Sequence, residues 1–196
     1  MTGPFDEPAD ATPLEPGERE GLLQSWIATR ADLNDAEQAN IDAGVAWARR
    51  RRRRDFLTED FVRALHKQMF GAVWGWAGTY RHTARNIGVD AYRIPGEVAQ
   101  FLGDTQYWIE NRIWLPDEIA VRLHHRLVAV YPFPNGNGRH ARMMADLLVQ
   151  QLGNAPFSWG GADLSDIGDK RRRYIEALRS ADAHDIGPLL TFARAT

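Results

Sequence analysis

Hydrophobic residues recur at the spacing of an α-helix along most of this chain. Phe61, Leu65 and Met69 fall at positions i, i+4 and i+8, so they share one face of a helix that opens at Thr58. The same period predicts further helices: from the N-cap candidate Asp32 to Arg49, over 98–109, from Pro116 to Val130, from Gly138 to Gly153, from Asp166 to Ala181 and from Asp185 to the end. We therefore expect an all-α domain.

Alternation of apolar and polar residues is convincing only over 86–95. The apolar positions mirror one another about the central pair Asp90-Ala91, which predicts one small β-hairpin. Pro95 would keep its second strand short. The residues that define the hairpin are Ile87, Gly88, Val89, Tyr92 and Ile94.

The chain is long enough for one domain with a sizeable core and too short for two ordinary ones, at 196 residues. Prolines recur among acidic and small residues near the N-terminus, which predicts an irregular lead-in over 1–20. We expect a single domain over 21–196.

Composition excludes several classes of protein. The chain has 24 Lys+Arg against 26 Asp+Glu, and this net charge of -2 argues against nucleic acid as a partner. The run Arg49 to Arg54 is better explained as a solvated helix end or a protein-contact patch. Because there is no cysteine, disulfides, thiolate zinc sites and cysteine nucleophiles are excluded. No apolar run reaches the length of a membrane helix and no secretion signal is present, so we expect a cytoplasmic protein without a membrane partner.

One segment carries the candidate chemistry, at 131–142: Tyr-Pro-Phe-Pro-Asn-Gly-Asn-Gly-Arg-His-Ala-Arg. Its prolines stop the preceding helix, and Gly136 and Gly138 allow positive φ angles. A helix begins directly behind them, so its first amides and its dipole offer an anion site. Arg139 and Arg142 lie three residues apart on one face of that helix. Backbone amides with two guanidinium groups suit a polyphosphate.

Two other interpretations of this segment are weaker. A plain interhelical turn does not require two glycines, two prolines and two arginines in so short a stretch. The spacing Gly136-x-Gly138-x-x-Ala141 fits a dinucleotide-binding fingerprint, but that fingerprint follows a strand of a parallel sheet. Residues 117–130 have helical periodicity instead, so a phosphate-binding turn in a helical domain remains.

The segment resembles the signature of the Fic/Doc (Fido) family, H-P-F-x-[D/E]-G-N-G-R-x-x-R. The matching residues are Pro132, Phe133, Gly136, Asn137, Gly138, Arg139 and Arg142. The stretches 65–70 and 76–81 are similar to the family's upstream region, and 175–178 together with 185–192 are similar to its closing helices. Residues 10–50 and 116–148 resemble the bacterial "mobile mystery protein B" subgroup.

This resemblance implies a Fic helical bundle that transfers a nucleotide monophosphate, usually AMP from ATP with Mg²⁺, to a protein hydroxyl. It implies that the turn at 136–138 binds the phosphates, that Arg139 braces them and that Arg142 holds the γ-phosphate. Phe133 would anchor the loop in the core. The hairpin would be the family's flap, which docks a segment of the target protein as an added strand.

The chain departs from the signature at the position of the catalytic histidine, where it has Tyr131. A phenol with a pKa of about 10 is deprotonated to about one part in a thousand at pH 7, so it starts roughly 4 kcal/mol behind histidine as a general base. We expect activity to be reduced or abolished, whether the tyrosine is natural or introduced. His124, His125 and His140 lie nearby in sequence, but His140 follows Arg139 on the helix and is expected to point elsewhere.

Two further positions affect the resemblance. Asn135 replaces the Asp or Glu that serves the family as metal ligand, and an amide oxygen is a weaker Mg²⁺ ligand than a carboxylate. Many members also carry an inhibitory helix, [S/T]-x-x-x-E-[G/N], whose glutamate pairs with the second arginine. The stretch 33–38 keeps only the glutamate, which makes Glu37, paired with Arg142, the inhibitory candidate.

The leading hypothesis is a nucleotide-binding protein of the protein adenylyltransferase lineage, with Tyr131 and Arg139 at the catalytic positions. A catalytically silent nucleotide-binding or interaction module is the first alternative. A protein phosphotransferase like the Doc branch is the second, and Gly138 argues against it because that branch usually has lysine there. The expected partners are a nucleotide and a target protein on the flap, and a homo-oligomer is left open.

Overall fold

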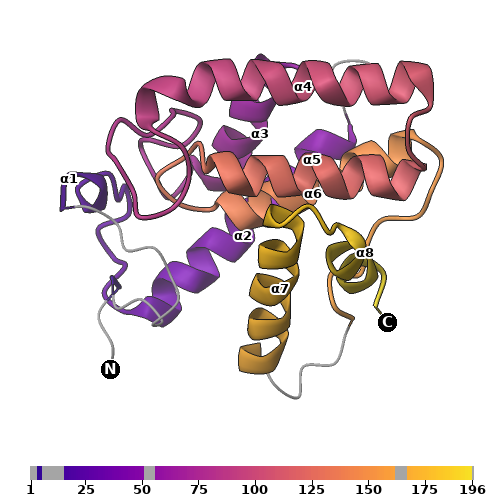
Figure 1. The fold of residues 1–196 in the computed structure, drawn as a ribbon. Coiled ribbons are helices and arrows are strands. Elements are labelled where there is room, and N and C mark those ends of the chain that lie inside the picture. The colour runs from indigo at the N-terminus through magenta and orange to yellow at the C-terminus, as the bar shows by residue number, and fades with distance from the viewer. Residues whose placement is uncertain (1–3, 6–15, 51–55, 162–166, 196) are drawn as a thin grey trace.

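The computed structural model describes residues 4–5, 16–50, 56–161 and 167–195. These residues form helices joined by loops, as Figure 1 shows, and the all-α prediction is confirmed. The helices are α1 Pro16–Arg19, α2 Arg30–Arg49, α3 Glu59–Phe70, the 3-10 turn η1 Ala91–Arg93, α4 Ile94–Asn111, α5 Pro116–Val130, α6 Asn137–Gln151, α7 Ile167–Asp182 and α8 Gly187–Arg194.

Local sequence explains where the helices begin. The Thr58 hydroxyl accepts a hydrogen bond from the backbone N–H of Phe61 at 3.2 Å, so α3 begins as predicted. α2 begins earlier than predicted, because its N-cap is Thr29 and Asp32 is the third helical residue of a capping box. α5 begins at Pro116 with acidic residues in its first turn, as predicted.

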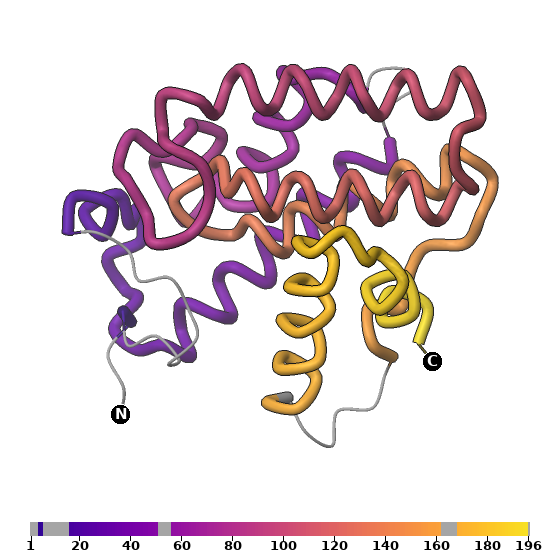
Figure 2. The backbone as a smooth tube through the Cα atoms, in the orientation of Figure 1, coloured from indigo at the N-terminus to yellow at the C-terminus, as the bar shows by residue number. Residues whose placement is uncertain are grey.

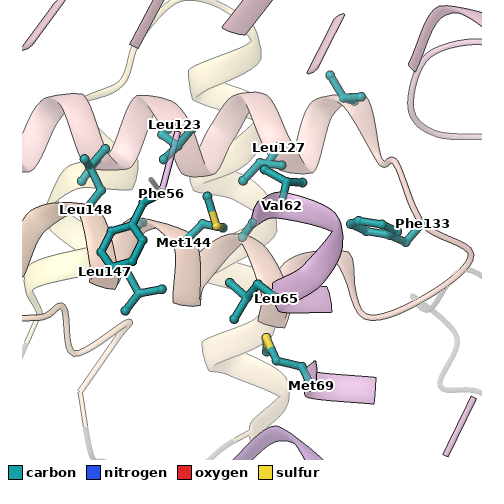
Figure 3. Packing of buried hydrophobic residues seen from close by; sticks show 14 of the residues in the cluster. Phe56, Val62, Leu65, Met69, Leu123, Leu127, Phe133, Met144, Leu147 and Leu148 are labelled. Carbon is teal, nitrogen blue, oxygen red and sulfur yellow. The ribbon is translucent and has the colours of Figure 1, made fainter. Parts of the chain in front are cut away.

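Helices α5 and α6 form the centre of the molecule (Figure 1). α5 packs against α6 and α4, α2 packs along α3, and α7 packs against α8. Figure 3 shows buried side chains of α3, α5 and α6 meeting between these helices: Val62, Leu65, Met69, Leu123, Leu127, Met144, Leu147 and Leu148. The loop that joins α5 to α6 is therefore mounted on two helices of the core. None of the described helices is long and apolar enough to cross a membrane.

The predicted β-hairpin at 86–95 is wrong. The chain runs as a loop through 82–90, called the 82–90 loop below, and then enters η1 and α4 (Figure 2). Pro95 lies in the first turn of α4, where a missing N–H costs no hydrogen bond. The residues assigned to strands lie instead in the loop (Ile87, Gly88, Val89), in η1 (Tyr92) and at the first position of α4 (Ile94).

The lead-in predicted to be irregular over 1–20 is helical in part, since residues 16–19 form the single helical turn α1. Residues 1–3 and 6–15 lie outside the described part of the chain. The Glu18 carbonyl accepts a hydrogen bond from Trp76 Nε1 at 3.0 Å. Its carboxylate accepts one from Thr83 Oγ1 at 3.2 Å and pairs with Arg85. α1 is thereby attached to the 82–90 loop.

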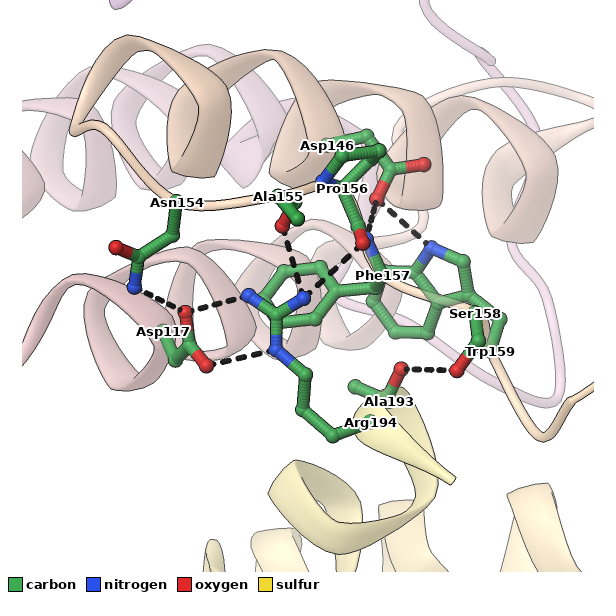
Figure 4. A network of polar contacts seen from close by, with 10 residues as sticks. All are labelled: Asp117, Asp146, Asn154, Ala155, Pro156, Phe157, Ser158, Trp159, Ala193 and Arg194. Atoms are coloured by element: carbon green, nitrogen blue, oxygen red, sulfur yellow. Dashed lines mark hydrogen bonds and ion pairs between the residues drawn. The ribbon is translucent and has the colours of Figure 1, made fainter. Parts of the chain in front are cut away.

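A polar network attaches the C-terminus to the centre of the fold (Figure 4). The Arg194 guanidinium donates to both oxygens of Asp117, at 2.6 and 2.7 Å, and these bonds hold the pKa of Asp117 below its ordinary value. Asp146 Oδ1 accepts hydrogen bonds from the Phe157 N–H at 3.0 Å and from Trp159 Nε1 at 3.1 Å. The network holds α8 and the segment after α6 against α5 and α6.

Candidate functional site

The N-terminus of α6 is the open end of a buried helix. Its N-cap is Gly136, which has φ 78° and no side-chain hydrogen bond to cap the helix. The N–H groups of Asn137, Gly138 and Arg139 have no acceptor within the helix, and the helix dipole adds positive potential there. Among the described residues, a Cβ built on Gly138 would have only the Tyr174 hydroxyl within 4 Å, at 3.9 Å. This end of the helix therefore has room for an anion.

The loop before α6 is closed by its own side chains. Asn137 Oδ1 accepts from the Phe133 N–H at 2.9 Å, and Asn137 Nδ2 donates to the Phe133 carbonyl at 2.8 Å. The Phe133 ring is fully buried in the core, as a side chain that anchors this loop has to be. A Cβ on Gly136 would lie 2.6 Å from the Phe70 ring, so only glycine fits at this turn. The Asn137 side chain is thus used within the loop, and its backbone N–H is the group available to a ligand.

His66 of α3 holds this loop by a hydrogen bond and by ring stacking. Its Nδ1 accepts a hydrogen bond from the Gly78 N–H at 3.0 Å, so the ring proton is on Nε2, which donates to the Asn135 carbonyl at 3.0 Å. The ring stacks on Phe133 with centroids 3.7 Å apart. Burial keeps the pKa of His66 well below its usual range, so the ring is neutral. Sequence reasoning gave His66 no role, although it lies four residues after Val62 and four before Phe70, on a buried face of α3.

A second residue without a predicted role, Arg81, joins the loop to its neighbours. Its side chain is buried, its Nε donates to the Tyr131 carbonyl at 2.7 Å, and its Nη1 donates to the Thr83 carbonyl at 2.8 Å. Its Nη2 donates to the Val89 carbonyl. The guanidinium therefore satisfies carbonyls at the C-terminus of α5 and in the 82–90 loop together. The stretch 76–81, which resembles the family, was the available signal.

Arg139 is held by a buried carboxylate. Its Nη1 lies 2.7 Å from Glu37 Oε2, and Trp74 Nε1 donates to Glu37 Oε1 at 2.7 Å. The Arg139 guanidinium also lies over the Phe70 ring, 5.0 Å from the centroid. The predicted pairing of Glu37 with Arg142 is wrong, because α2 approaches the start of α6 on the side of Arg139.

Arg142 is supported from the opposite side. Its guanidinium carbon lies 5.5 Å from the centroid of the Tyr174 ring, which α7 contributes. The two arginines predicted to face one spot have different supports: Glu37 of α2 pairs with Arg139, and the Tyr174 ring of α7 lies against Arg142. The charge of Arg139 is balanced by the Glu37 carboxylate, whereas the Arg142 guanidinium lies over an uncharged ring.

Tyr131 lies at the junction between the 82–90 loop and the site. It is the C-cap of α5 and has φ 53°, a left-handed conformation. Gly88, with φ 85°, approaches it so closely that a Cβ there would lie 2.7 Å from the Tyr131 Cβ. The Val89 N–H donates to the Val130 carbonyl at 3.3 Å. The loop predicted to be the flap thus lies directly against the residue at the base position.

The nearby histidines have other partners. His140 is buried, its Nε2 bonds to the Val62 carbonyl at 2.9 Å, and burial lowers its pKa to about 4. His124 is also buried and contacts the Tyr174 hydroxyl. His125 Nε2 lies 2.8 Å from Asp182 Oδ1. The expectation that His140 points elsewhere is confirmed.

Asn135 does not offer a free ligand for Mg²⁺. Its side-chain Oδ1 accepts a hydrogen bond from the Gly136 N–H at 2.5 Å, and its carbonyl is bound by His66. In the described part of the chain no three His, Cys, Asp or Glu side chains come together as a metal-binding group. The side chains present here therefore do not fit a protein-held Mg²⁺ site.

An all-α bundle with a Gly-Asn-Gly turn at a helix N-terminus is the combination expected of a Fic-type domain. Residues 56–149 match the Fic/DOC family, and this range contains α3, α4, α5 and the whole loop at 131–136. The chain contains a Fic/DOC family domain.

Curated relatives carry the same domain within longer chains. The protein adenylyltransferase Fic of Aedes aegypti is 26% identical over 144 residues, which cover 70% of this chain and 27% of that protein. The protein of the same name from Nematostella vectensis is 28% identical over 145 residues, covering 71% of this chain and 32% of that one. This chain thus spans about a quarter to a third of the length of these relatives.

Solved structures share the fold. Fic-1 of C. elegans (residues 134–508) superposes with a TM-score of 0.65 and 23% identity, covering 89% of this chain and 50% of that one. The BepC protein of Bartonella tribocorum, solved with bound AMPPNP, gives a TM-score of 0.66 and 18% identity, covering 91% of this chain and 96% of that one. At these identities the likeness shows the fold.

Proposed function

We propose that this chain binds ATP at the N-terminus of α6 and belongs to the protein adenylyltransferase lineage. One observation carries the proposal: the N–H groups at 137–139 are uncapped, and the first two turns of the same helix carry two separately supported guanidinium groups, Arg139 and Arg142. Amides, helix dipole and paired arginines together match the charge and the oxygen atoms of a polyphosphate. The names of the curated relatives support the same reaction class.

The reaction of this lineage is an in-line displacement at the α-phosphorus of ATP. A target hydroxyl oxygen forms the new bond to phosphorus, the bond to the β-phosphate oxygen breaks, and pyrophosphate leaves. The hydroxyl proton has to pass to a base, and Tyr131 occupies that position. A phenol is a poor base at neutral pH. We therefore expect slow or absent transfer, which also favours the alternative of a silent nucleotide-binding module.

The remaining parts of the proposal concern the surroundings of the site. The target protein docks along the 82–90 loop, where Ile87 is 44% exposed and Gly88 brings the backbone to Tyr131. Mg²⁺ accompanies the phosphates of ATP, with Asn135 contributing weakly or not at all. The subgroup resemblance adds a bacterial source, the composition of the chain adds a cytoplasmic location, and a homo-oligomer is a further candidate partner.

Binding and transfer are tested separately. Titration calorimetry with ATP and Mg²⁺ should show binding that weakens at least about tenfold in Arg142→Ala, because a charged hydrogen bond is lost. Arg142→Ala is preferable to Arg139→Ala, which leaves the Glu37 carboxylate without its cation. Absence of binding by the unmodified chain would contradict the proposal.

Transfer is followed with ATP labelled at the α- or the γ-phosphate in a lysate. Tyr131→His should label the chain itself or another protein from the α-position, above the level of the unmodified chain. Binding without any transfer by Tyr131→His indicates the silent module. A γ-label alone indicates phosphotransfer and excludes adenylyl transfer.

A further inference from the structure

A half-buried tyrosine and a buried histidine form a hydrogen-bonded pair beside the open end of α6. The Tyr174 hydroxyl lies 3.0 Å from His124 Nε2, and His124 is fully buried in α5. The same hydroxyl is 3.9 Å from the position of a Cβ on Gly138, at the second residue of α6. The pair is therefore next to the N–H groups that have no acceptor in the helix.

The proton of this pair can be assigned. Burial and the nearby charge of Arg142 hold the pKa of His124 well below its usual range, so the ring is neutral and carries one proton. Its Nδ1 is buried without a hydrogen-bond partner in the described part of the chain. An unpaired buried N–H is rarer in folded proteins than an incompletely bonded acceptor. The proton therefore belongs on Nε2, where it is donated to the Tyr174 oxygen.

This assignment leaves the hydroxyl proton of Tyr174 unused. The oxygen is the acceptor in its contact with His124, and no acceptor for its own proton is found among the described residues. Burial raises the pKa of Tyr174 to about 12, so the phenol keeps that proton at neutral pH. The ring contacts two side chains: its centroid lies 5.5 Å from the Arg142 guanidinium carbon and 5.5 Å from the centroid of the Phe192 ring. The donor is fixed in place before any ligand arrives.

We propose that the Tyr174 hydroxyl, oriented by His124, donates a hydrogen bond to a phosphate oxygen of the nucleotide bound at the N-terminus of α6. Gly138 and Arg142 are four residues apart and share the face of α6 that Tyr174 borders. A phosphate oxygen over Gly138 would accept a hydrogen bond from the Tyr174 hydroxyl and would be attracted by the charge of the neighbouring Arg142. His124 is a positioning residue, because it acts through Tyr174. This inference rests on the proposed nucleotide site.

The test uses Tyr174→Phe, which retains the ring beneath Arg142 and removes only the hydroxyl. Titration calorimetry compares ATP, inorganic tripolyphosphate and adenosine. A hydrogen bond to a charged oxygen predicts that ATP and tripolyphosphate bind about tenfold more weakly or worse, with adenosine unchanged. Tyr107→Phe, at an exposed tyrosine of α4, is the matched control and should bind as the unmodified chain does.

The outcomes separate the two proposals. Unchanged affinity of Tyr174→Phe for ATP and tripolyphosphate overturns the role of Tyr174 and leaves the nucleotide site standing. A loss confined to adenosine also overturns it, because the hydroxyl would then contact the nucleoside. If the unmodified chain binds neither ATP nor tripolyphosphate, both proposals fail. A ¹⁵N spectrum of the unmodified chain supplies a check without a variant: His124 should be protonated on Nε2, and protonation on Nδ1 contradicts the inference.

Discussion

Removing Arg139 should destabilise the fold more than neutralising Glu37, although the two side chains form one ion pair. The Glu37 side chain is 4% exposed and the Arg139 side chain 36% exposed. Arg139→Ala leaves a buried carboxylate with one neutral donor, Trp74, and the loss of a partner at a buried charge costs about 3–5 kcal/mol. Glu37→Gln keeps an oxygen for Trp74 and leaves Arg139 in contact with water, so it should cost about 1 kcal/mol.

The combination of the two changes gives a prediction of opposite sign. In the Arg139→Ala background, Glu37→Gln replaces an unpaired buried carboxylate by a neutral amide. The second change should therefore raise the free energy of unfolding, by about 1–3 kcal/mol, since burying an unpaired charge costs more than burying a bonded amide. The same substitution destabilises the unmodified chain.

Urea unfolding followed by circular dichroism measures all four proteins, with the slopes compared to confirm that one transition is observed. Glu176→Gln, at an exposed position of α7, is the control and should change stability by less than about 0.5 kcal/mol in either background. If Glu37→Gln lowers stability by the same amount with and without Arg139, the carboxylate is not held by this pair and the reasoning is refuted.

Three other substitutions probe the loop and the core. Gly136→Ala requires a side chain at φ 78° and 2.6 Å from Phe70, so it should lower thermal stability by about 1–3 kcal/mol, and an unchanged melting temperature would contradict this geometry. Gly138→Ala has space and should be neutral or stabilising by up to about 1 kcal/mol, while its methyl group weakens ATP binding; undiminished binding would place the anion elsewhere. Burial raises the pKa of Asp146 to about 6 from 3.8, so the folded chain retains this proton longer and loses stability through this group as pH rises from about 4 to 6. Asp146→Asn, which can still accept from Trp159, should remove that slope and raise stability at pH 7.5 by at most about 3 kcal/mol, with no gain at pH 4; a less stable variant at pH 7.5 would contradict the assignment.

The helices were predictable because their signals are local. Thr58 and Pro116 act within one turn of their own positions, and the apolar period of α3 is visible without knowledge of its neighbours. The hairpin prediction was wrong because it, too, used only local signals. A short apolar alternation around Gly88 satisfies a strand template, whereas Pro95 and the buried Ile94 begin a helix whose stability comes from packing against α5.

The candidate site also has one part that could be predicted from the sequence and one part that could not. The turn at 136–138 and the spacing of Arg139 and Arg142 could be read directly, because backbone freedom and helix periodicity depend on neighbouring residues. The supports of the site could not. Glu37 is 102 positions from Arg139 and was assigned to the wrong arginine, since only the packing of α2 decides which side of α6 it reaches.

The sequence by itself determined an all-α chain with a glycine turn at a helix N-terminus, because helix period, capping and glycine conformation are properties of short segments. It also placed a tyrosine where the related signature has histidine. Only the tertiary structure decided what surrounds that turn. Shielded polar atoms need hydrogen-bond partners within the fold. Four residues from distant segments therefore surround the turn: His66 and Arg81 bond to the loop, and Glu37 and Tyr174 contact the arginines of α6. The long-range packing that shields their polar atoms from water is what builds the candidate site around the local turn.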